Sequence, residues 1–178
     1  MNPLDIIENY YDKNSELCRI LITHSTSVTQ KALSIAKNHP ELNIDAKFVS
    51  EAGMLHDIGI FMTDAPSIHC FGKYPYIAHG YLGKELLEKN GFPRHALVCE
   101  RHTGAGLTLD EIISQDLPLP HHEMVPVSIE EQLICFADCF YSKTHLDKEK
   151  SVEKIVKSMS KFNERSKNQF LVWCDIFL

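Results

Sequence analysis

His56 and Asp57 are neighbours whose side chains could hold one metal ion together. They follow the apolar residues Met54 and Leu55, and Gly59 comes shortly after them. A neutral imidazole and a carboxylate suit divalent ions of intermediate hardness, so the pair indicates a transition metal such as Fe, Mn, Zn, Co or Ni. The apolar run before the pair predicts that it lies near the end of a buried helix.

Four further residues of the same ligand types lie along the chain. Asp138 is the most informative of these, because it has apolar neighbours and an unpaired carboxylate is costly there unless a cation or water meets it. Each histidine taken alone would more often be a surface residue or a hydrogen-bonded core residue. Acids and histidines on separate helices are typical of a metal site in a helix bundle. The four residues are His24, His79, His102 and Asp138.

Helix start and stop signals predict that the chain is all-α. Asn2-Pro3 is a good opening for a first short helix, and Thr108–Glu111 and Ser128–Glu131 have the pattern of capping boxes. Residues 61–77 lack helical periodicity, which predicts a loop over the site and no sheet of more than two short strands. The predicted helices after the first span about 15–38, as one helix or two abutting ones, 45–55, 78–90, 93–102, a short one that begins at 108, 128–140, 148–160 and 164–176.

Length and composition bound the class of protein. The 178 residues, 44% hydrophobic and 24% charged, predict a single globular domain 1–178, with a core at about 15–145 and a C-terminal helical extension at 146–178. The net charge of −6 argues against nucleic acid as the main partner. No apolar run could span a membrane and no secretion signal opens the chain, and none of the six cysteines forms a Cys-x-x-Cys pair. We therefore expect a cytoplasmic protein.

The order of these ligand types resembles that of the HD-domain superfamily of metal-dependent phosphohydrolases, in the variant whose motif reads His-Asp-Ile-Gly. The segments 78–87, 100–108 and 136–138 look like those of a small HDIG subfamily of single-domain proteins. The resemblance covers about residues 15–145. It implies an HD-domain helical bundle.

The resemblance also implies a role for each ligand. His24, His56 and Asp138 would hold a first ion, and Asp57 would give one oxygen to it and the other to a second ion. His79 and His102 would complete the second position and leave room for water or substrate. Two ions about 3.5–4 Å apart can share a hydroxide and stabilise a phosphoryl transfer. This arrangement gives Asp57 a catalytic role.

Substrate phosphate would need hydrogen-bond donors and positive charge. Many HDIG proteins have Lys or Arg directly after the glycine of the motif, but this chain has Ile60 there. Other residues near the predicted ligands in sequence could bind the phosphate instead. They are His69, Lys73, Lys84, Arg101 and Lys143.

The sequence thus favours a metal-dependent phosphohydrolase that acts on a small phosphorylated metabolite or nucleotide through two ions. The chain lacks the Gly-Tyr-Pro signature of the best-known cyclic-di-GMP phosphodiesterases, so that substrate is not favoured. A di-iron oxygenase of the same fold is the alternative, and Ile60 makes it more attractive. A non-catalytic HD regulatory module is a third reading. The sequence leaves both a monomer and a homodimer open.

Overall fold

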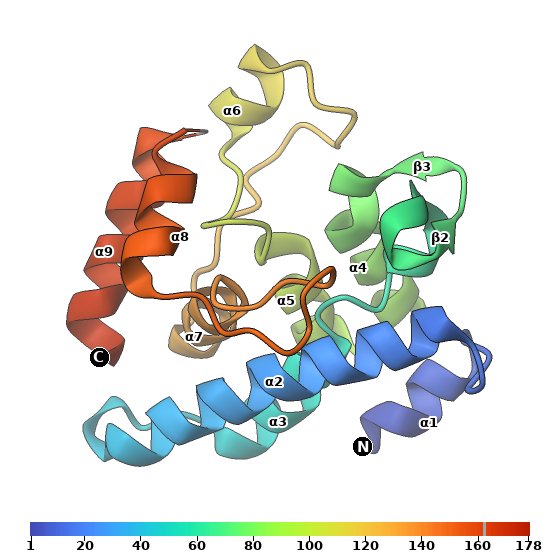
Figure 1. Ribbon diagram of the computed structural model, residues 1–178, viewed down its shortest axis with the longest axis horizontal. Coiled ribbons are helices and arrows are strands. Elements are labelled where there is room, and N and C mark those ends of the chain that lie inside the picture. The colour runs from blue at the N-terminus through green and yellow to red at the C-terminus, as the bar shows by residue number, and fades with distance from the viewer. Residues whose placement is uncertain (162) are drawn as a thin grey trace.

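The computed structural model describes residues 1–161 and 163–178, and helices dominate it (Figure 1). The prediction of an all-α fold is confirmed. In the part of the chain that the structure describes, no helix is both long and apolar enough to cross a membrane. The helices are α1 (Pro3–Glu8), α2 (Glu16–Asn38), α3 (Ala46–Leu55), α4 (His79–Lys89), α5 (Pro93–Arg101), α6 (Leu109–Ser114), α7 (Ile129–Asp138), α8 (Val152–Met159) and α9 (Glu164–Phe177).

The segment between α3 and α4 contains a small sheet of three strands. Strand β1 (Thr63–Ala65) lies in the middle, antiparallel to β2 (Cys70–Phe71) and parallel to β3 (Tyr74–Pro75). Gly72 permits the chain to fold back here, because a Cβ atom on it would lie 2.1 Å from the carbonyl carbon of Met62. The predicted limit of two short strands was therefore wrong. Strands of two or three residues are too short to show an alternating pattern.

Helices α2 and α3 lie against each other along one side of the molecule (Figure 1). Ser15 caps α2 by accepting a hydrogen bond from the Cys18 backbone N–H, and the helix then continues unbroken to Asn38. The two helices approach closely at Gly53, where a Cβ atom would lie 2.5 Å from Thr29 Oγ1. This contact brings the middle of α2 close to the end of α3.

Helices α4 and α5 form an antiparallel hairpin. Gly91 provides the turn with φ of +84°, a conformation that favours glycine, and Pro93 opens α5. Gly80 lets the helices approach, because a Cβ atom there would lie 2.5 Å from the Cys99 carbonyl oxygen. The start of α4 and the end of α5 therefore lie at the same end of the hairpin, as the sequence predicts.

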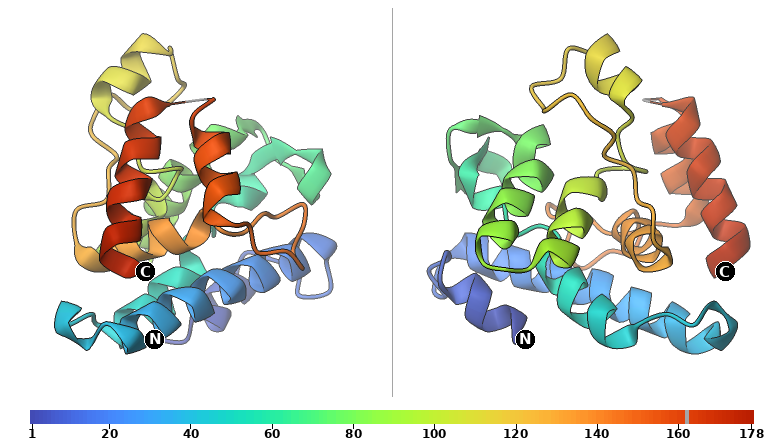
Figure 2. Two further views of the ribbon diagram at one scale, coloured as in Figure 1. Left: turned by 60° about the vertical axis from the view of Figure 1, so that its left-hand side comes forward. Right: turned by 180° about the vertical axis from the view of Figure 1, so that it is seen from behind.

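The C-terminal helices complete the core on the side of α7 that faces away from α2 and α3. Figure 2 shows α8 and α9 side by side, and α9 packs on α7 through the buried rings of Phe170, Trp173 and Phe177. The predicted extension 146–178 thus contributes to the same apolar core as α2, α3 and α7.

The two predicted capping boxes differ in the structure. The box at Thr108 is complete. Ser128 caps α7, but the Glu131 carboxylate accepts hydrogen bonds from Val127 N–H and Arg101 instead of closing the box.

Candidate metal centre

Four of the predicted ligands form a group that we call the first cluster. His24 comes from the middle of α2, His56 is the C-cap of α3, Asp57 follows it, and Asp138 ends α7. One ligand atom from each lies within 4.8 Å of all the others. His24 Nε2 lies 2.9 Å from Asp138 Oδ1 and 3.2 Å from Asp57 Oδ2, and His56 Nε2 lies 3.1 Å from the same Asp57 oxygen. This group could hold a metal ion.

Asp57, His79 and His102 form the second cluster. His79 Nε2 and His102 Nε2 lie 3.4 and 3.3 Å from Asp57 Oδ1, and 3.0 Å from each other. This group also meets the geometric requirement for holding an ion. The two oxygens of Asp57 thus face different clusters, and all six residues expected from the sequence come together at one place.

Three of the histidines are oriented in the same way by the backbone. Nδ1 of His56, His79 and His102 lies 2.6, 2.7 and 2.7 Å from the carbonyl oxygen three residues earlier in each case. A carbonyl can only accept, so Nδ1 must donate, and the neutral imidazole then has a free electron pair on Nε2. Metal-binding histidines are commonly fixed by such a bond on the opposite ring nitrogen.

The unsatisfied atoms of the site test whether a metal fits. His56 Nε2 and both Asp57 oxygens are buried and lack any well-aligned hydrogen bond. In the second cluster, His79 Nε2 and His102 Nε2 face each other at 3.0 Å, and because both rings donate through Nδ1, neither neutral ring has a proton to place between them. Such an arrangement is costly unless a cation lies there. The mixed nitrogen and oxygen donors suit a divalent transition metal. The residues therefore fit a bound metal.

Electrostatic effects differ between the clusters. Burial alone lowers the pKa of His56, but the Asp57 and Asp138 carboxylates outweigh it and raise this pKa to about 10. In the second cluster burial and the neighbouring His102 lower the pKa of His79 to about 3. His79 is therefore neutral near pH 7, which is the form that binds metal.

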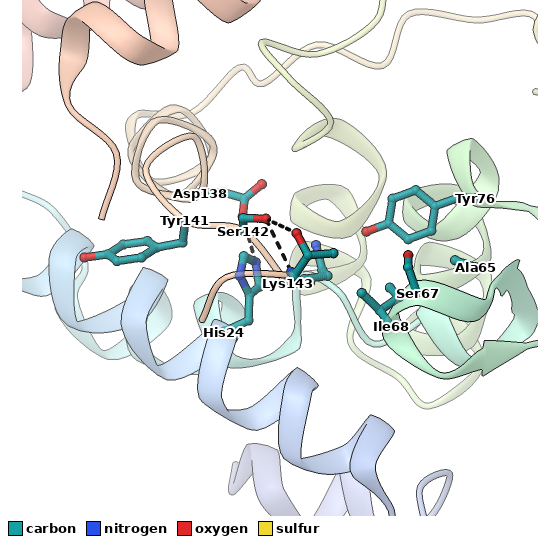
Figure 3. A pocket seen from close by; sticks show the side chains of 10 residues that line it. His24, Ala65, Ser67, Ile68, Tyr76, Asp138, Tyr141, Ser142 and Lys143 are labelled. Carbon is teal, nitrogen blue, oxygen red and sulfur yellow. Dashed lines mark hydrogen bonds and ion pairs between the residues drawn. The ribbon is translucent and has the colours of Figure 1, made fainter. Parts of the chain in front are cut away.

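A cation and a cavity adjoin the first cluster. Burial alone raises the pKa of Asp57, but Lys143 and then His56 keep it well below the usual range. Lys143 Nζ lies 2.6 Å from Asp57 Oδ2, and its side chain is 12% exposed. The lysine also borders a cavity of about 300 Å³ that reaches the metal ligands (Figure 3). Residues that line this cavity include His24, Asp138, Tyr76, Ser142, Lys143 and Thr144.

The other predicted phosphate-binding residues lie elsewhere. His69 is exposed and lines a neighbouring cavity that also borders Lys143. Lys73 is exposed, Lys84 pairs with the buried Glu100 at 2.9 Å, and Arg101 pairs with Glu131 at 2.9 Å. None of these three lines the cavity beside the metal ligands.

Their placement outside this cavity gives no support to the prediction that Lys73, Lys84 and Arg101 bind substrate, which stays a prediction. It rested on their distance from the ligands along the chain, but for Lys84 on α4 and Arg101 on α5 helical geometry points residues a few positions apart in different directions. The buried carboxylates of Glu100 and Glu131 also require cationic partners, which Lys84 and Arg101 supply.

Two tyrosines support the site and were missed by the sequence analysis. The Tyr76 ring stacks on His79 with centroids 4.6 Å apart, and its carbonyl accepts the His79 Nδ1 hydrogen bond. The Tyr11 hydroxyl donates to the Ile58 carbonyl at 2.7 Å, which holds the turn after Asp57. Tyr76 could have been found as the aromatic residue three positions before a predicted ligand. Tyr11 gives no such local signal.

Comparison with known proteins agrees with this geometry. The chain belongs to the HD domain family, whose pattern matches residues 21–143, so the resemblance seen in the sequence is confirmed. It is 33% identical over 138 residues to an uncharacterised protein of Methanocaldococcus jannaschii, covering 76% of this chain and 70% of that protein.

Two further similarities are more limited. The chain is 30% identical over 142 residues to a tRNA (cytidine(56)-2'-O)-methyltransferase of Thermoplasma volcanium, covering 79% of this chain but only 36% of that enzyme. The crystal structure of the HD domain of the L. monocytogenes phosphodiesterase PgpH superposes with a TM-score of 0.49 at 15% identity. That superposition covers 85% of this chain and 88% of the other.

Proposed function

We propose that this protein is a metal-dependent phosphohydrolase that acts on a small phosphate ester or nucleotide at a dinuclear His/Asp centre. The observation that carries the proposal is the position of Asp57, whose two carboxylate oxygens face two separate groups of ligands. Membership of the HD domain family supports it. The net charge of −6 favours a small phosphorylated molecule over nucleic acid as the partner.

The metal ions and the residues that bind them would have different roles in the reaction. When bound, two divalent transition-metal ions would lower the pKa of a shared water and neutralise charge on the phosphoryl group. The backbone bonds to Nδ1 of His56, His79 and His102 hold the imidazoles in one orientation, so little rearrangement is needed when ligands bind. Asp57 itself is fully buried, so bulk water does not compete for its carboxylate.

Tyr76 and Lys143 would orient the substrate in the cavity. The Tyr76 hydroxyl points toward Lys143 in Figure 3. Burial raises the pKa of Tyr76 to about 12, so it is a neutral phenol near pH 7 and can donate a hydrogen bond. Lys143 supplies a positive charge beside the first cluster. An anionic phosphate would be attracted to this side of the centre.

A metal and substrate screen tests the proposed function. Protein purified without chelator would be supplied with Mn²⁺ and incubated with a panel of phosphate esters and nucleotides, and released phosphate would be measured. We expect phosphate release that depends on Mn²⁺ and is lost in Asp57→Asn. The exposed Asp64 of β1 offers a matched control in Asp64→Asn, which should behave as wild type.

Other outcomes of the same screen would contradict the proposal. Substrate-dependent oxygen uptake by the iron-loaded protein, without phosphate release, would support a di-iron oxygenase. Stable metal binding with neither reaction would support a regulatory HD module.

A further inference from the structure

The residue that follows the glycine of the His-Asp-Ile-Gly motif cannot supply positive charge to this site. Ile60 is fully buried and packs in the apolar core with Leu55 and Ile58. Gly59 presses this turn against α4, because a Cβ atom on it would lie 2.2 Å from the His79 carbonyl oxygen. The backbone is therefore fixed here, and the side chain at position 60 belongs to the core.

Lys143 provides the positive charge from another part of the chain. It lies in the segment between α7 and α8, five residues after Asp138. Among the described residues, no other lysine or arginine forms an ion pair with any of the six candidate ligands. The side chain is almost buried, so its charge is poorly compensated by water and needs an anionic partner.

The position of this ammonium group conflicts with that of a metal on the first cluster. Lys143 Nζ lies 2.6 Å from Asp57 Oδ2, the oxygen that also faces Nε2 of His24 and of His56. An ion held by these ligands would use the same oxygen. Two cations on one carboxylate oxygen repel each other strongly in a buried site, so the ammonium and the ion exclude each other there.

The structure offers the displaced side chain a place to go. Lysine has a flexible four-carbon stem, and Lys143 lies outside any helix or strand. It borders two cavities, of about 300 and about 420 Å³, which share Ser67 and Thr144. Tyr76, Ser142 and Thr144, whose side chains carry hydroxyl groups, are among the residues that line the first of them. Rotation of the stem into this cavity would place the ammonium beside these side chains, where a phosphate oxygen could bind.

We propose that Lys143 exchanges with the first metal ion on Asp57 and then binds the substrate's phosphate group. The ammonium neutralises Asp57 until the ion arrives. It then turns into the cavity and holds a phosphate oxygen opposite Tyr76. This inference rests on the proposed function, and it explains how a chain with Ile60 retains a phosphate-binding cation.

Two binding measurements test the exchange. Free Mn²⁺ would be counted by electron paramagnetic resonance during titration of wild type, Lys143→Met and Lys143→Gln. Both variants should bind the first Mn²⁺ at least roughly tenfold more tightly, because no ammonium competes for Asp57. The Mn²⁺-loaded variants should bind inorganic phosphate at least roughly tenfold more weakly than loaded wild type.

The exposed Lys148 of the same segment provides the matched control. Lys148→Met should leave both affinities unchanged, and thermal melting would verify that every variant is folded. Equal Mn²⁺ affinity in wild type and both Lys143 variants would overturn the exchange. Unchanged phosphate affinity would overturn the role in substrate binding.

The same measurements distinguish an error in the proposed function from an error in the proposed exchange of Lys143. If wild type binds two Mn²⁺ and hydrolyses phosphate esters while the Lys143 variants match it, only the exchange is wrong. If wild type binds Mn²⁺ but hydrolyses no phosphate ester, the proposed function is wrong, and the affinity shifts still decide the exchange. If neither wild type nor the variants bind Mn²⁺, both are wrong.

Discussion

The two halves of the candidate metal centre are assembled in different ways. In the first cluster, His24 and Asp138 are separated by 114 residues and lie on α2 and α7. In the second, His79 and His102 are separated by 23 residues and lie at the same end of one helical hairpin. The second cluster is thus mainly a product of local structure, whereas the first requires most of the bundle to be folded.

The clusters also differ in their access to solvent. The Asp138 side chain is 19% exposed and borders the cavity beside Lys143, whereas His79 and His102 are 5% and 2% exposed. The first cluster is therefore the side from which ions and substrate can approach. The comparison predicts that disturbances of the bundle affect the first cluster, and that changes in the hairpin affect the second.

Replacing Asp57 should break both clusters at once and have the largest effect. Asp57→Ala removes the one carboxylate that faces both groups, so we expect loss of both ions and a fall in hydrolysis of about ten-thousandfold, or about 5 kcal/mol. Elemental analysis and phosphate release would measure these effects. Asp64→Ala, at an exposed position, is the control. If Asp57→Ala retains two ions, the Asp57 carboxylate is not needed as a metal ligand in either cluster.

A change in the C-terminal core should separate the clusters. The Phe170 ring on α9 is fully buried, with its centroid 5.2 Å from that of Phe136 on α7, the helix that ends at Asp138. Phe170→Ala should lower the free energy of unfolding by about 3–5 kcal/mol. In the folded protein it should weaken the first ion site more than the second. Urea denaturation and Mn²⁺ titration would measure both effects.

Val172, which is exposed on the same helix, provides the control for the Phe170 change. Val172→Ala should alter neither stability nor metal binding appreciably. Equal weakening of both ion sites by Phe170→Ala would contradict the separate dependence of the clusters on the bundle and on the hairpin.

Removal of one hairpin histidine should affect only the second cluster. His79→Ala or His102→Ala should lose one ion, retain the other and reduce hydrolysis by about a hundredfold, or about 3 kcal/mol. The fold should survive, because the apolar contacts between α4 and α5 remain. Metal analysis at saturation would decide this, with the exposed His121→Ala as control. One ion per chain in both wild type and His79→Ala would leave only a mononuclear mechanism.

A substitution in the ion-pair network of Glu111 and Arg165, which is remote from the metal centre, should affect neither cluster and should have the smallest effect of these changes. Burial alone raises the pKa of Glu111, but hydrogen bonds from Arg165 and the Thr108 backbone lower it from 4.5 to about 2. A lowered folded-state pKa stabilises the protein above pH 4.5, and this stabilisation is lost as the pH falls toward 2. Glu111→Gln should cost about 1–3 kcal/mol at pH 7 and less at each lower pH below 4.5, while both ions stay bound at pH 7.

Chemical denaturation of wild type and Glu111→Gln at pH 7, 5, 4 and 3 would measure this difference. A difference in unfolding free energy that stays constant down to pH 3 would show that the Glu111 carboxylate is not held ionised by Arg165.

Local sequence signals predicted much of the fold. Because these signals connect residues only a few positions apart, they miss features that depend on more distant residues. Asp45 caps α3 and Thr108 closes a capping box at α6, because these bonds involve residues three positions apart. The hairpin of α4 and α5 followed from Gly91 and Pro93 in the same way. The sheet at 63–75 was missed, because its pairing depends on a chain reversal and not on a repeating pattern.

The site was predictable only where residue type or local structure restricted the choice. The order of histidines and aspartates indicated the six candidate ligands, which the structure brings together. Lys84, Arg101 and Lys143 are all cationic residues that lie within five positions of a predicted ligand in the sequence. Only tertiary structure shows that Lys143 reaches Asp57, while Lys84 and Arg101 reach buried glutamates.

Anomalous X-ray diffraction from crystals of the Mn²⁺-loaded protein would show whether Asp57 joins two metal ions. We predict two anomalous peaks about 3.5–4 Å apart, one beside each Asp57 oxygen. His24, His56 and Asp138 should surround one peak, and His79 and His102 the other. A single peak, or peaks that leave Asp57 without a metal contact, would show that Asp57 does not join two ions.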